Sequence, residues 1–549
     1  MSFPSSIWSA IGSRHLSSTF VSLDVYFRGA DNAAKIPIEA HLVKNFKAKL
    51  LISMDVTGHE GLRLDFDAKT GSLDQCSRSG GVSRRLRNMI DPRAVDGNLS
   101  PELGFNAVWK GFQSLFLCDI PIAMASPSPF LITEHVIDSQ HVREYPRATR
   151  TGDDALKLMV KQYTPKSNPH PQPGDLTIIG AHGSGFPKRK ELYEPIWEGV
   201  LTQLSEKGIR VRSIWIADIA NQAASGVLNG EYLGNDPSWF DHARDLLYMI
   251  NHFKRDMPRP IVGIGHSLGA GQLVLLSMMH PRLLTSLVLI EPVIEKDVYT
   301  GKGPIFVKLS LDKKDTWESR EKAASHFKKQ FKTWDPKVLE RWLKYGLRSL
   351  PDSDAVTLTT SRSQEVMYYM RPNFDNRKRL SSKNDPSTMS EHDPCFHADI
   401  IGPAHAVYPF YRNEPILLWH ILRHVRPSVL YLFGDRSPVS TPDLRGEKLT
   451  RTGTGIGGSG GWKNHRVKEI TIPRTGHQLP FENVPRICEE TAGWLKQEVA
   501  RWSEDEARIL EGWLDDTQET RASVPKGWQE HLNACLSQPT EMPKAQSKL

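Results

Sequence analysis

The sequence predicts an α/β fold built on a mostly parallel sheet with flanking helices. Between residues 131 and 500, apolar runs of five to eight residues alternate with amphipathic helical stretches, and this alternation is typical of βαβ units. Hydrophobic residues make up 39% of the 549-residue chain, which is enough for a large buried core. Between about 297 and 425 the strand rhythm stops and Lys, Arg, Trp and Tyr occur in helix-like stretches, so we expect an inserted helical cap there.

Six short runs, most of them predominantly apolar, are expected to form strands of this sheet. In chain order they are 176–181, 211–217, 260–264, 286–290, 428–433 and 467–472. Apolar positions at helical spacing predict a helix over 241–253, and a second helix is expected over 269–280.

The two ends of the chain differ from its middle. Residues 1–130 mix strand-like pieces with Gly- and Ser-rich interruptions, and we expect an N-terminal extension whose structure the sequence does not specify. Residues 501–549 are helical and charged, then Pro-rich, and are expected to form a C-terminal extension. Its Ser547, Lys548 and Leu549 match a peroxisomal address. We therefore expect peroxisomal localisation and recognition by the peroxisomal import receptor.

Composition excludes several classes of function. The net charge of +7 is mild and no basic cluster marks one face, so nucleic-acid binding is not expected. No apolar run reaches the roughly 20 residues that a membrane helix requires. The 5 cysteines are scattered and fit neither a zinc pattern nor a disulfide framework, which favours a reducing compartment. We expect no metal and no cofactor.

A G-x-S-x-G motif, Gly265-His266-Ser267-Leu268-Gly269, lies between a predicted strand and a predicted helix. A nucleophile elbow requires this context, because its serine occupies a strained turn in which neighbouring side chains would collide. We therefore predict that Ser267 is a catalytic nucleophile. The alternative is an ordinary glycine-rich turn.

A second glycine-containing loop, His182-Gly183-Ser184-Gly185, directly follows the predicted strand 176–181. In this architecture such a loop supplies one backbone N–H to an oxyanion hole, and the residue after the nucleophile supplies the other. We assign these amides to Ser184 and Leu268. The alternative is a β-turn without a ligand.

The general base is expected just past the last predicted strand, in the stretch Thr475-Gly476-His477-Gln478-Leu479-Pro480-Phe481. A histidine there completes the chain order nucleophile, acid, base. The chain has 20 histidines, and His477 has the required position.

The acid has two candidates. Glu291 immediately follows the strand 286–290, whereas Asp435 follows the strand 428–433. The customary slot for an acid after the latter strand holds Ser437, two residues beyond Asp435. We favour Glu291 and keep Asp435 as the alternative. Either would have to orient the imidazole and stabilise the imidazolium.

Several longer runs show that the stretch from about 131 to 500 resembles a fungal branch of the α/β-hydrolases. This branch includes the peroxisomal acyl-CoA hydrolase of mycophenolic acid biosynthesis and hydrolases of host-selective toxin pathways. The runs that carry the resemblance are 132–136, 160–166, 191–195, 241–247, 257–260 and 455–461. The resemblance implies an α/β-hydrolase fold with an inserted cap.

The resemblance also implies roles for individual residues. The nucleophile maps onto Ser267, the base onto His477, and the acid, which follows the strand after the nucleophile, onto Glu291. The archetype carries Asp at that position, so Glu291 is a departure, and Ser437 in the other slot is consistent with the family. Lys188-Arg189 is an apparent two-residue excess, and the first 130 residues lie outside the pattern.

These observations predict a serine hydrolase that forms an acyl-enzyme on Ser267. The resemblance favours an acyl-CoA thioesterase of fungal secondary-metabolite or toxin biosynthesis, and the peroxisomal address agrees with it. The alternatives are a carboxylic ester hydrolase or lipase of peroxisomes and, less favoured, a non-catalytic scaffold. The expected partner is a small-molecule acyl thioester or ester. The sequence specifies neither the acyl group nor the oligomeric state.

Overall fold

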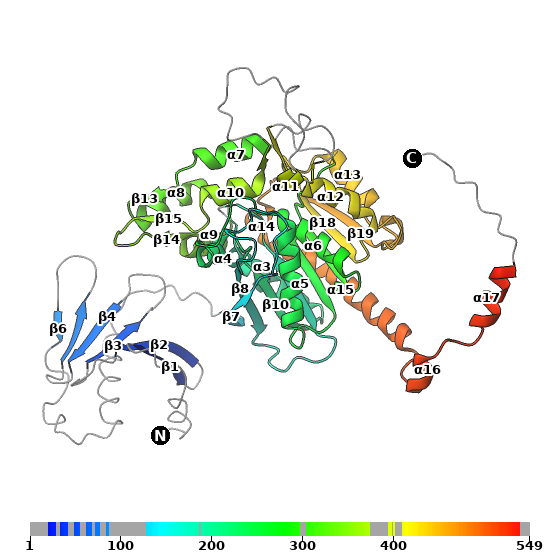
Figure 1. The fold of residues 1–549 in the computed structure, drawn as a ribbon. Helices are drawn as coiled ribbons and strands as arrows, with labels where there is room; N and C mark the ends of the chain where they lie inside the picture. The colour runs from blue at the N-terminus through cyan, green and yellow to red at the C-terminus, as the bar shows by residue number, and fades with distance from the viewer. Residues whose placement is uncertain are drawn as a thin grey trace, which may run out of the picture. The chain divides into compact units, whose positions relative to one another are not determined.

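The computed structural model describes six strands between residues 20 and 86, and residues 128–537 apart from 186–187, 297–302, 374–393, 398 and 401–408. The chain divides into two compact units, Met1–Ser126 and Pro127–Leu549 (Figure 1). The second unit contains every residue predicted for the site. Ser547, Lys548 and Leu549 lie outside the described residues.

The first unit contains two antiparallel β-structures. Strands β1 (Phe20–Arg28) and β2 (Ala33–His41) form a pair. A four-stranded sheet has the order β3-β4-β5-β6. Its strands are β3 (Lys49–Met54), β4 (Leu62–Asp67), β5 (Ser72–Cys76) and β6 (Arg84–Leu86).

The second unit is built on an eight-stranded sheet with the order β19-β18-β12-β11-β9-β10-β8-β7. Neighbouring strands from β19 to β10 pair in parallel, whereas β8 is antiparallel to both β10 and β7. The strands are β7 (Phe130–Asp138), β8 (Lys157–Pro165), β9 (Leu176–Ala181), β10 (Val211–Ala217), β11 (Ile261–His266), β12 (Ser286–Ile290), β18 (Ser428–Gly434) and β19 (Val467–Ile472). The predicted α/β fold with a mostly parallel sheet is confirmed.

Strands in the centre of this sheet are apolar without alternation, because both of their faces are covered. All residues of β9, β11, β12 and β18 are buried, as expected for parallel strands between two helical layers. Side chains of α3 (Glu194–Glu206) and α15 (Val484–Leu510) pack on one face. Those of α5 (Phe240–His252) and α6 (Leu268–Met279) pack on the other.

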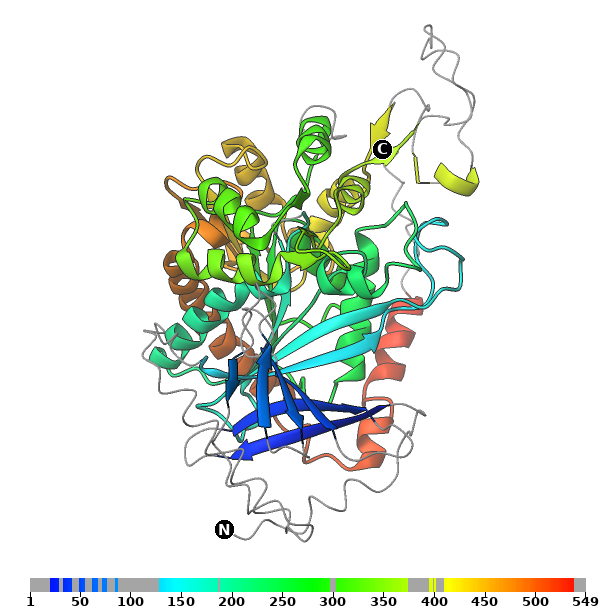
Figure 2. The ribbon, with the colours of Figure 1, turned by 90° about the vertical axis from the view of Figure 1, so that its left-hand side faces the viewer.

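A long insertion separates β12 from β18. In both views it lies together at one end of the second unit, in green to yellow (Figures 1 and 2). Its helices are α7 (Gly303–Asp312), α8 (Arg320–Gln330), α9 (Pro336–Tyr345), α10 (Arg362–Tyr369), α11 (Pro394–His397) and α12 (Glu414–Ile421), and its short strands are β13 (Thr316–Trp317), β14 (Leu347–Ser349), β15 (Val356–Leu358), β16 (Arg371–Pro372) and β17 (Phe410–Tyr411).

The remaining elements connect the strands or follow the sheet. They are η2 (Lys190–Tyr193), α4 (Ala223–Leu228), η5 (Leu422–His424), α13 (Pro442–Arg451), η6 (Trp462–Asn464), α14 (Leu479–Glu482), α16 (Gln518–Ala522) and α17 (Trp528–Ser537). In the described part of the chain, no helix has the length and apolar character needed to cross a membrane.

Candidate active site

Ser267 occupies the sharp turn between β11 and α6. Its φ of 59° lies in the left-handed region, which a residue other than glycine adopts only under strain. The flanking glycines are required because a Cβ at Gly265 would lie 2.8 Å from the backbone nitrogen of Ala270, and one at Gly269 would lie 2.4 Å from the carbonyl oxygen of Ala181. The turn therefore has the geometry of a nucleophile elbow.

Three side chains from different strand ends form a hydrogen-bonded chain. Ser267 Oγ lies 2.9 Å from Nε2 of His477, and Nδ1 of His477 lies 3.2 Å from Oε2 of Glu291. The carboxyl ends of parallel strands meet at one edge of a sheet, which is why segments separated by 210 residues converge here. The structure thus brings together the three residues that the sequence predicts as nucleophile, base and acid.

Glu291 is fully buried and hydrogen-bonded at both oxygens. Oε1 accepts from the Gly434 N–H at 2.7 Å and from the Ser440 hydroxyl at 2.9 Å, while the Ser437 hydroxyl donates to Oε2. Burial acts to raise the pKa of Glu291, but the hydrogen bonds from His477, Ser437 and Gly434 together with the charge of His477 outweigh it and lower the pKa. The carboxylate is therefore held ionised against the imidazole.

Asp435, the alternative acid, contacts a different part of the loop. Its carboxylate accepts a hydrogen bond from the Thr475 N–H at 3.2 Å, and backbone hydrogen bonds from Arg474 and Thr475 lower its pKa. The side chain is solvent-exposed and caps the backbone ahead of His477 rather than contacting the ring. The geometry favours Glu291 as the partner of His477.

The predicted oxyanion loop lies against the elbow. A Cβ on Gly183 would lie 3.1 Å from Cβ of Ser267, so the loop approaches the elbow closely at this glycine. Ser184 and Leu268 line the same cavity as Ser267. The Ser184 hydroxyl accepts from the Gln222 side chain at 2.8 Å, which fixes the loop.

Two positioning residues were not predicted from the sequence. Tyr193 Oη accepts from the Gly183 N–H at 3.0 Å and lies 2.8 Å from Nδ1 of His266, whose Nε2 lies 2.9 Å from the carbonyl oxygen of His477. These contacts join the predicted oxyanion loop, the turn at Ser267 and the loop that carries His477. A polar residue in the second position of the G-x-S-x-G motif is the only local signal for this network.

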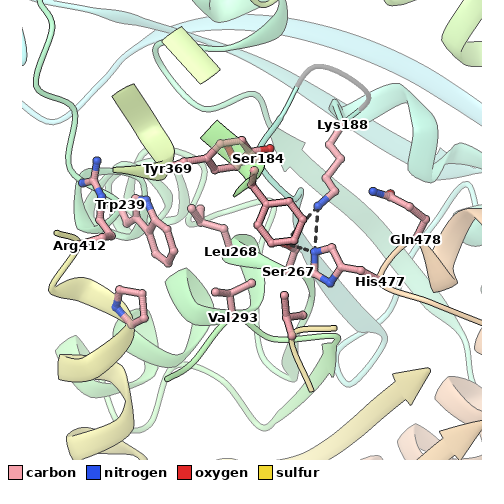
Figure 3. Close-up of a pocket in the computed structure, with 13 residues that line it drawn as sticks. Ser184, Lys188, Trp239, Ser267, Leu268, Val293, Tyr369, Arg412, His477 and Gln478 are labelled. Atoms are coloured by element: carbon pink, nitrogen blue, oxygen red, sulfur yellow. Dashed lines mark hydrogen bonds between the residues drawn. The ribbon is translucent and has the colours of Figure 1, made fainter. Parts of the chain in front are cut away.

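Lys188 was also not predicted as a site residue. Its ammonium donates to Ser267 Oγ at 3.2 Å and lies 3.2 Å from His477 Nε2 (Figure 3). Burial lowers the pKa of Lys188 from 10.5 to about 7, partly opposed by the charge of Glu291. Its position in the loop after β9 could have marked it as a candidate.

The surroundings of His477 lower the pKa of its imidazole. Burial lowers its pKa, the charge of Lys188 lowers it further, and Glu291 partly opposes both effects. The imidazole is therefore neutral at pH 7 and able to accept a proton at Nε2.

A cavity opens in front of Ser267, and Lys188, His477 and Ser184 line it as well. Apart from the groups already described, it is mainly apolar and aromatic (Figure 3). The guanidinium of Arg412 is paired with Glu414 at 2.9 Å. The apolar lining residues are Trp239, Leu268, Val293, Phe306, Tyr369, Pro415 and Val439.

A search for metal ligands within the described ranges finds no group of three or more His, Cys, Asp or Glu side chains that could hold an ion. The chemistry available at this site is that of a serine, an imidazole, a carboxylate, a lysine and oriented backbone amides.

Three known proteins similar to this chain come from fungi. The type I acyl-CoA thioesterase mpaH' of Penicillium brevicompactum is 38% identical over 430 residues, covering 73% of this chain and 95% of that protein. The type I acyl-CoA thioesterase mpaH of Penicillium roqueforti is 39% identical over 407 residues, covering 69% of this chain and 91% of that protein. The abhydrolase domain-containing protein AFT2-1 of Alternaria alternata is 26% identical over 294 residues, covering 51% of this chain and 100% of that protein.

A solved structure agrees on the fold. The peroxisomal alpha-beta-hydrolase Lpx1 of Saccharomyces cerevisiae aligns with a TM-score of 0.50 at 17% identity, covering 74% of this chain and 96% of that protein. Residues 178–491 match the alpha/beta hydrolase family. The resemblance drawn from the sequence motifs is thereby confirmed: the chain belongs to the alpha/beta hydrolase family and is a hydrolase.

Proposed function

We propose that the protein is a serine hydrolase that cleaves acyl thioesters of the acyl-CoA class. The observation that carries the proposal is the hydrogen-bonded chain from Ser267 through His477 to Glu291, which opens into an apolar cavity. The names of the Penicillium relatives support a thioester substrate.

The reaction begins with attack of Ser267 Oγ on the acyl carbonyl carbon. His477 takes the hydroxyl proton at Nε2, and Glu291 stabilises the resulting imidazolium through Nδ1–H. The backbone amides of Ser184 and Leu268 hold the oxyanion of the tetrahedral intermediate. Collapse of this intermediate expels the thiol, which takes the proton from His477.

The acyl-enzyme is then hydrolysed by water. His477 again acts as the base, this time for the attacking water, and returns the proton to Ser267 when the ester bond breaks. The acyl chain occupies the apolar cavity, and we propose that the insertion between about 297 and 425 covers it as a cap. Phe306 and Tyr369 come from this insertion and line the cavity.

The test is a substrate panel of acyl-CoA thioesters, nitrophenyl esters and triacylglycerols. Wild-type protein should prefer acyl-CoA, and Ser267→Ala should lose several orders of magnitude in turnover. Ser277→Ala is the matched control, because this buried serine lies on α6 and donates to the Val274 carbonyl at 2.7 Å, outside the site. Ester-only hydrolysis would indicate an esterase or lipase, and a Ser267→Ala variant with more than about a tenth of wild-type activity would refute the serine mechanism.

We further propose that the enzyme works in fungal secondary-metabolite biosynthesis inside peroxisomes. The resemblance to the mycophenolic acid and toxin-pathway hydrolases supports the first part, and the Ser547-Lys548-Leu549 motif supports the second through the peroxisomal import receptor. Deletion of the tripeptide from a tagged protein should move it from peroxisomes to the cytosol. Unchanged localisation would show that the import receptor does not read this motif here.

A further inference from the structure

Lys188 points its ammonium at the catalytic pair rather than at a carboxylate. Its side chain is buried, with the residue only 4% exposed, and Nζ lies 3.2 Å from both Ser267 Oγ and His477 Nε2. Two other buried lysines of this unit pair with carboxylates, Lys161 with Glu194 at 3.3 Å and Lys190 with Asp218. Buried Lys448 donates instead to the Pro292 carbonyl. Lys188 is therefore a cation placed against the reacting groups.

The surroundings of Lys188 are built to admit this side chain. A Cβ on Gly183 would lie 2.6 Å from Cδ of Lys188, so the lysine stem runs over a glycine of the oxyanion loop. Burial of the ammonium lowers its pKa to about 7. Burying a cation without a carboxylate partner opposes folding, and such perturbed groups cluster at functional sites.

Lys188 Nζ lies beside the two atoms that a leaving group must approach. During acyl transfer the departing atom collects the proton that His477 Nε2 took from Ser267, so it must lie within hydrogen-bond reach of Nε2. It also starts one bond from the carbon that Ser267 Oγ attacks. Lys188 Nζ lies within reach of the same two atoms.

We propose that Lys188 is a catalytic residue that stabilises the sulfur leaving group of a thioester. This inference rests on the proposed thioesterase function. When substrate binds, the ammonium moves from Nε2 to the sulfur. The C–S bond then breaks, its electron pair stays on sulfur, and the Lys188 ammonium donates a hydrogen bond to the developing thiolate. The thiolate takes its proton from the His477 imidazolium, and Lys188 keeps its own.

Sulfur and oxygen leaving groups differ in how much they gain from a nearby cation. A thiol has a pKa of about 8.5, so sulfur can depart with most of its negative charge developed. An alkoxide is far more basic, with water itself near 15.7, and must receive its proton as the bond breaks. His477 supplies that proton in either case. The Lys188 cation should therefore accelerate thioester cleavage much more than ester cleavage.

The role depends on the charge of Lys188 and hence on pH. The titratable groups that face its ammonium are His477 after β19, Glu291 after β12 and His266 at the end of β11. Since the pKa of Lys188 is about 7, the cation is lost as the pH rises through this value. A neutral lysine acting instead as a base would give the opposite dependence.

The experiment compares two substrates that differ in one atom: the octanoyl thioester of N-acetylcysteamine and the octanoyl ester of N-acetylethanolamine. Lys188→Met should lower kcat/KM for the thioester by about 100-fold, the typical effect of removing one preorganised donor, and that for the oxygen ester by no more than about 3-fold. Lys188→Arg should retain part of the thioester preference. In wild type, the ratio of kcat/KM for the thioester to kcat/KM for the oxygen ester should fall with rising pH. In Lys188→Met this ratio should not change with pH.

Lys448→Met is the matched control, because Lys448 is also buried but donates to the Pro292 carbonyl at 3.2 Å. In Lys448→Met, the ratio of kcat/KM for the thioester to kcat/KM for the oxygen ester should equal that of wild type. Equal losses on both substrates in Lys188→Met, no loss, or a ratio that rises with pH would overturn the role of Lys188 alone. Wild-type protein that does not cleave the thioester would overturn the proposed function, and the Lys188 role with it. Circular dichroism and a second variant, Lys188→Gln, exclude loss of fold as the cause.

Discussion

Replacement of Glu291 by Gln tests the acid, and the hydrogen bonds around it allow the result to be worked out. Oε1 accepts from the Gly434 N–H, whose direction is fixed by the backbone, so the amide oxygen must occupy this position. The amide NH₂ then faces His477 Nδ1 and the Ser437 hydroxyl. The hydroxyl can rotate to accept, and the imidazole can accept only by moving its proton to Nε2.

The variant should therefore fold normally but hold His477 in the wrong tautomer. With its proton on Nε2, the imidazole cannot take the proton of Ser267. In serine proteases the corresponding change lowers turnover about 10⁴-fold, equivalent to about 5.4 kcal/mol in the activation free energy. Glu291→Asp should lose less, because the charge remains although the carboxylate is drawn back by one methylene.

The assay is kcat at saturating acyl-CoA, with thermal unfolding followed in parallel. Asp435→Asn is the matched control, since it removes a carboxylate from the same edge of the sheet without touching the imidazole, and it should be nearly neutral. A crippled Asp435→Asn together with an active Glu291→Gln would refute the reasoning and give the acid role to Asp435.

Three other outcomes, from the substitutions Lys188→Met and Ser437→Asp, have directions that follow from the same contacts. The acid limb of the pH–rate profile should have its midpoint below pH 6.5, and Lys188→Met should move it to higher pH, because the ammonium lowers the pKa of His477. Lys188→Met should also raise the melting temperature by several degrees. The fall of the Lys188 pKa from 10.5 to about 7 opposes folding by up to about 5 kcal/mol below pH 7, an effect that shrinks between pH 7 and 10.5. Ser437→Asp should lower activity at neutral pH, because two carboxylates in contact share a proton; unchanged rates would contradict the geometry.

The parts of the fold that the sequence predicts are those with local signals. The strands 176–181, 211–217 and 286–290 have the observed bounds, because short apolar runs between turns are characteristic of buried parallel strands. The bounds of 467–472 are also as predicted, although this strand lies at the edge of the sheet and only its two end residues are buried. The third strand was expected to end at residue 264 but continues to His266. The glycines of the elbow do not favour a strand by propensity, yet the sheet extends up to Ser267. Strands β7 and β8 were not predicted, because polar residues interrupt the apolar pattern of both and β7 is a largely exposed edge strand.

The parts of the site that depend on long-range contacts could not be derived from spacing. Glu291 and Asp435 both follow strands that end at the same edge, so position along the chain does not choose between them. Tyr193 and His266 act through a network whose members lie on separate elements. The sequence marks Lys188 only as part of a two-residue excess, and the role of this residue depends on the direction in which the loop after β9 points its side chain.

Glu291 after β12 and Ser437 in the customary acid position after β18 are neighbours in space. This explains the use of glutamate at position 291. Strands β12 and β18 pair in parallel with Ile290 opposite Leu432, so the turns that follow them lie side by side. The longer side chain of Glu291 reaches across to the β18 turn, where Gly434 and Ser437 hold it. A carboxylate at 437 would face Glu291 directly, whereas the Ser437 hydroxyl donates to it. The glutamate after β12 and the serine after β18 are therefore two halves of one arrangement, in which the β18 turn supplies donors instead of the charge.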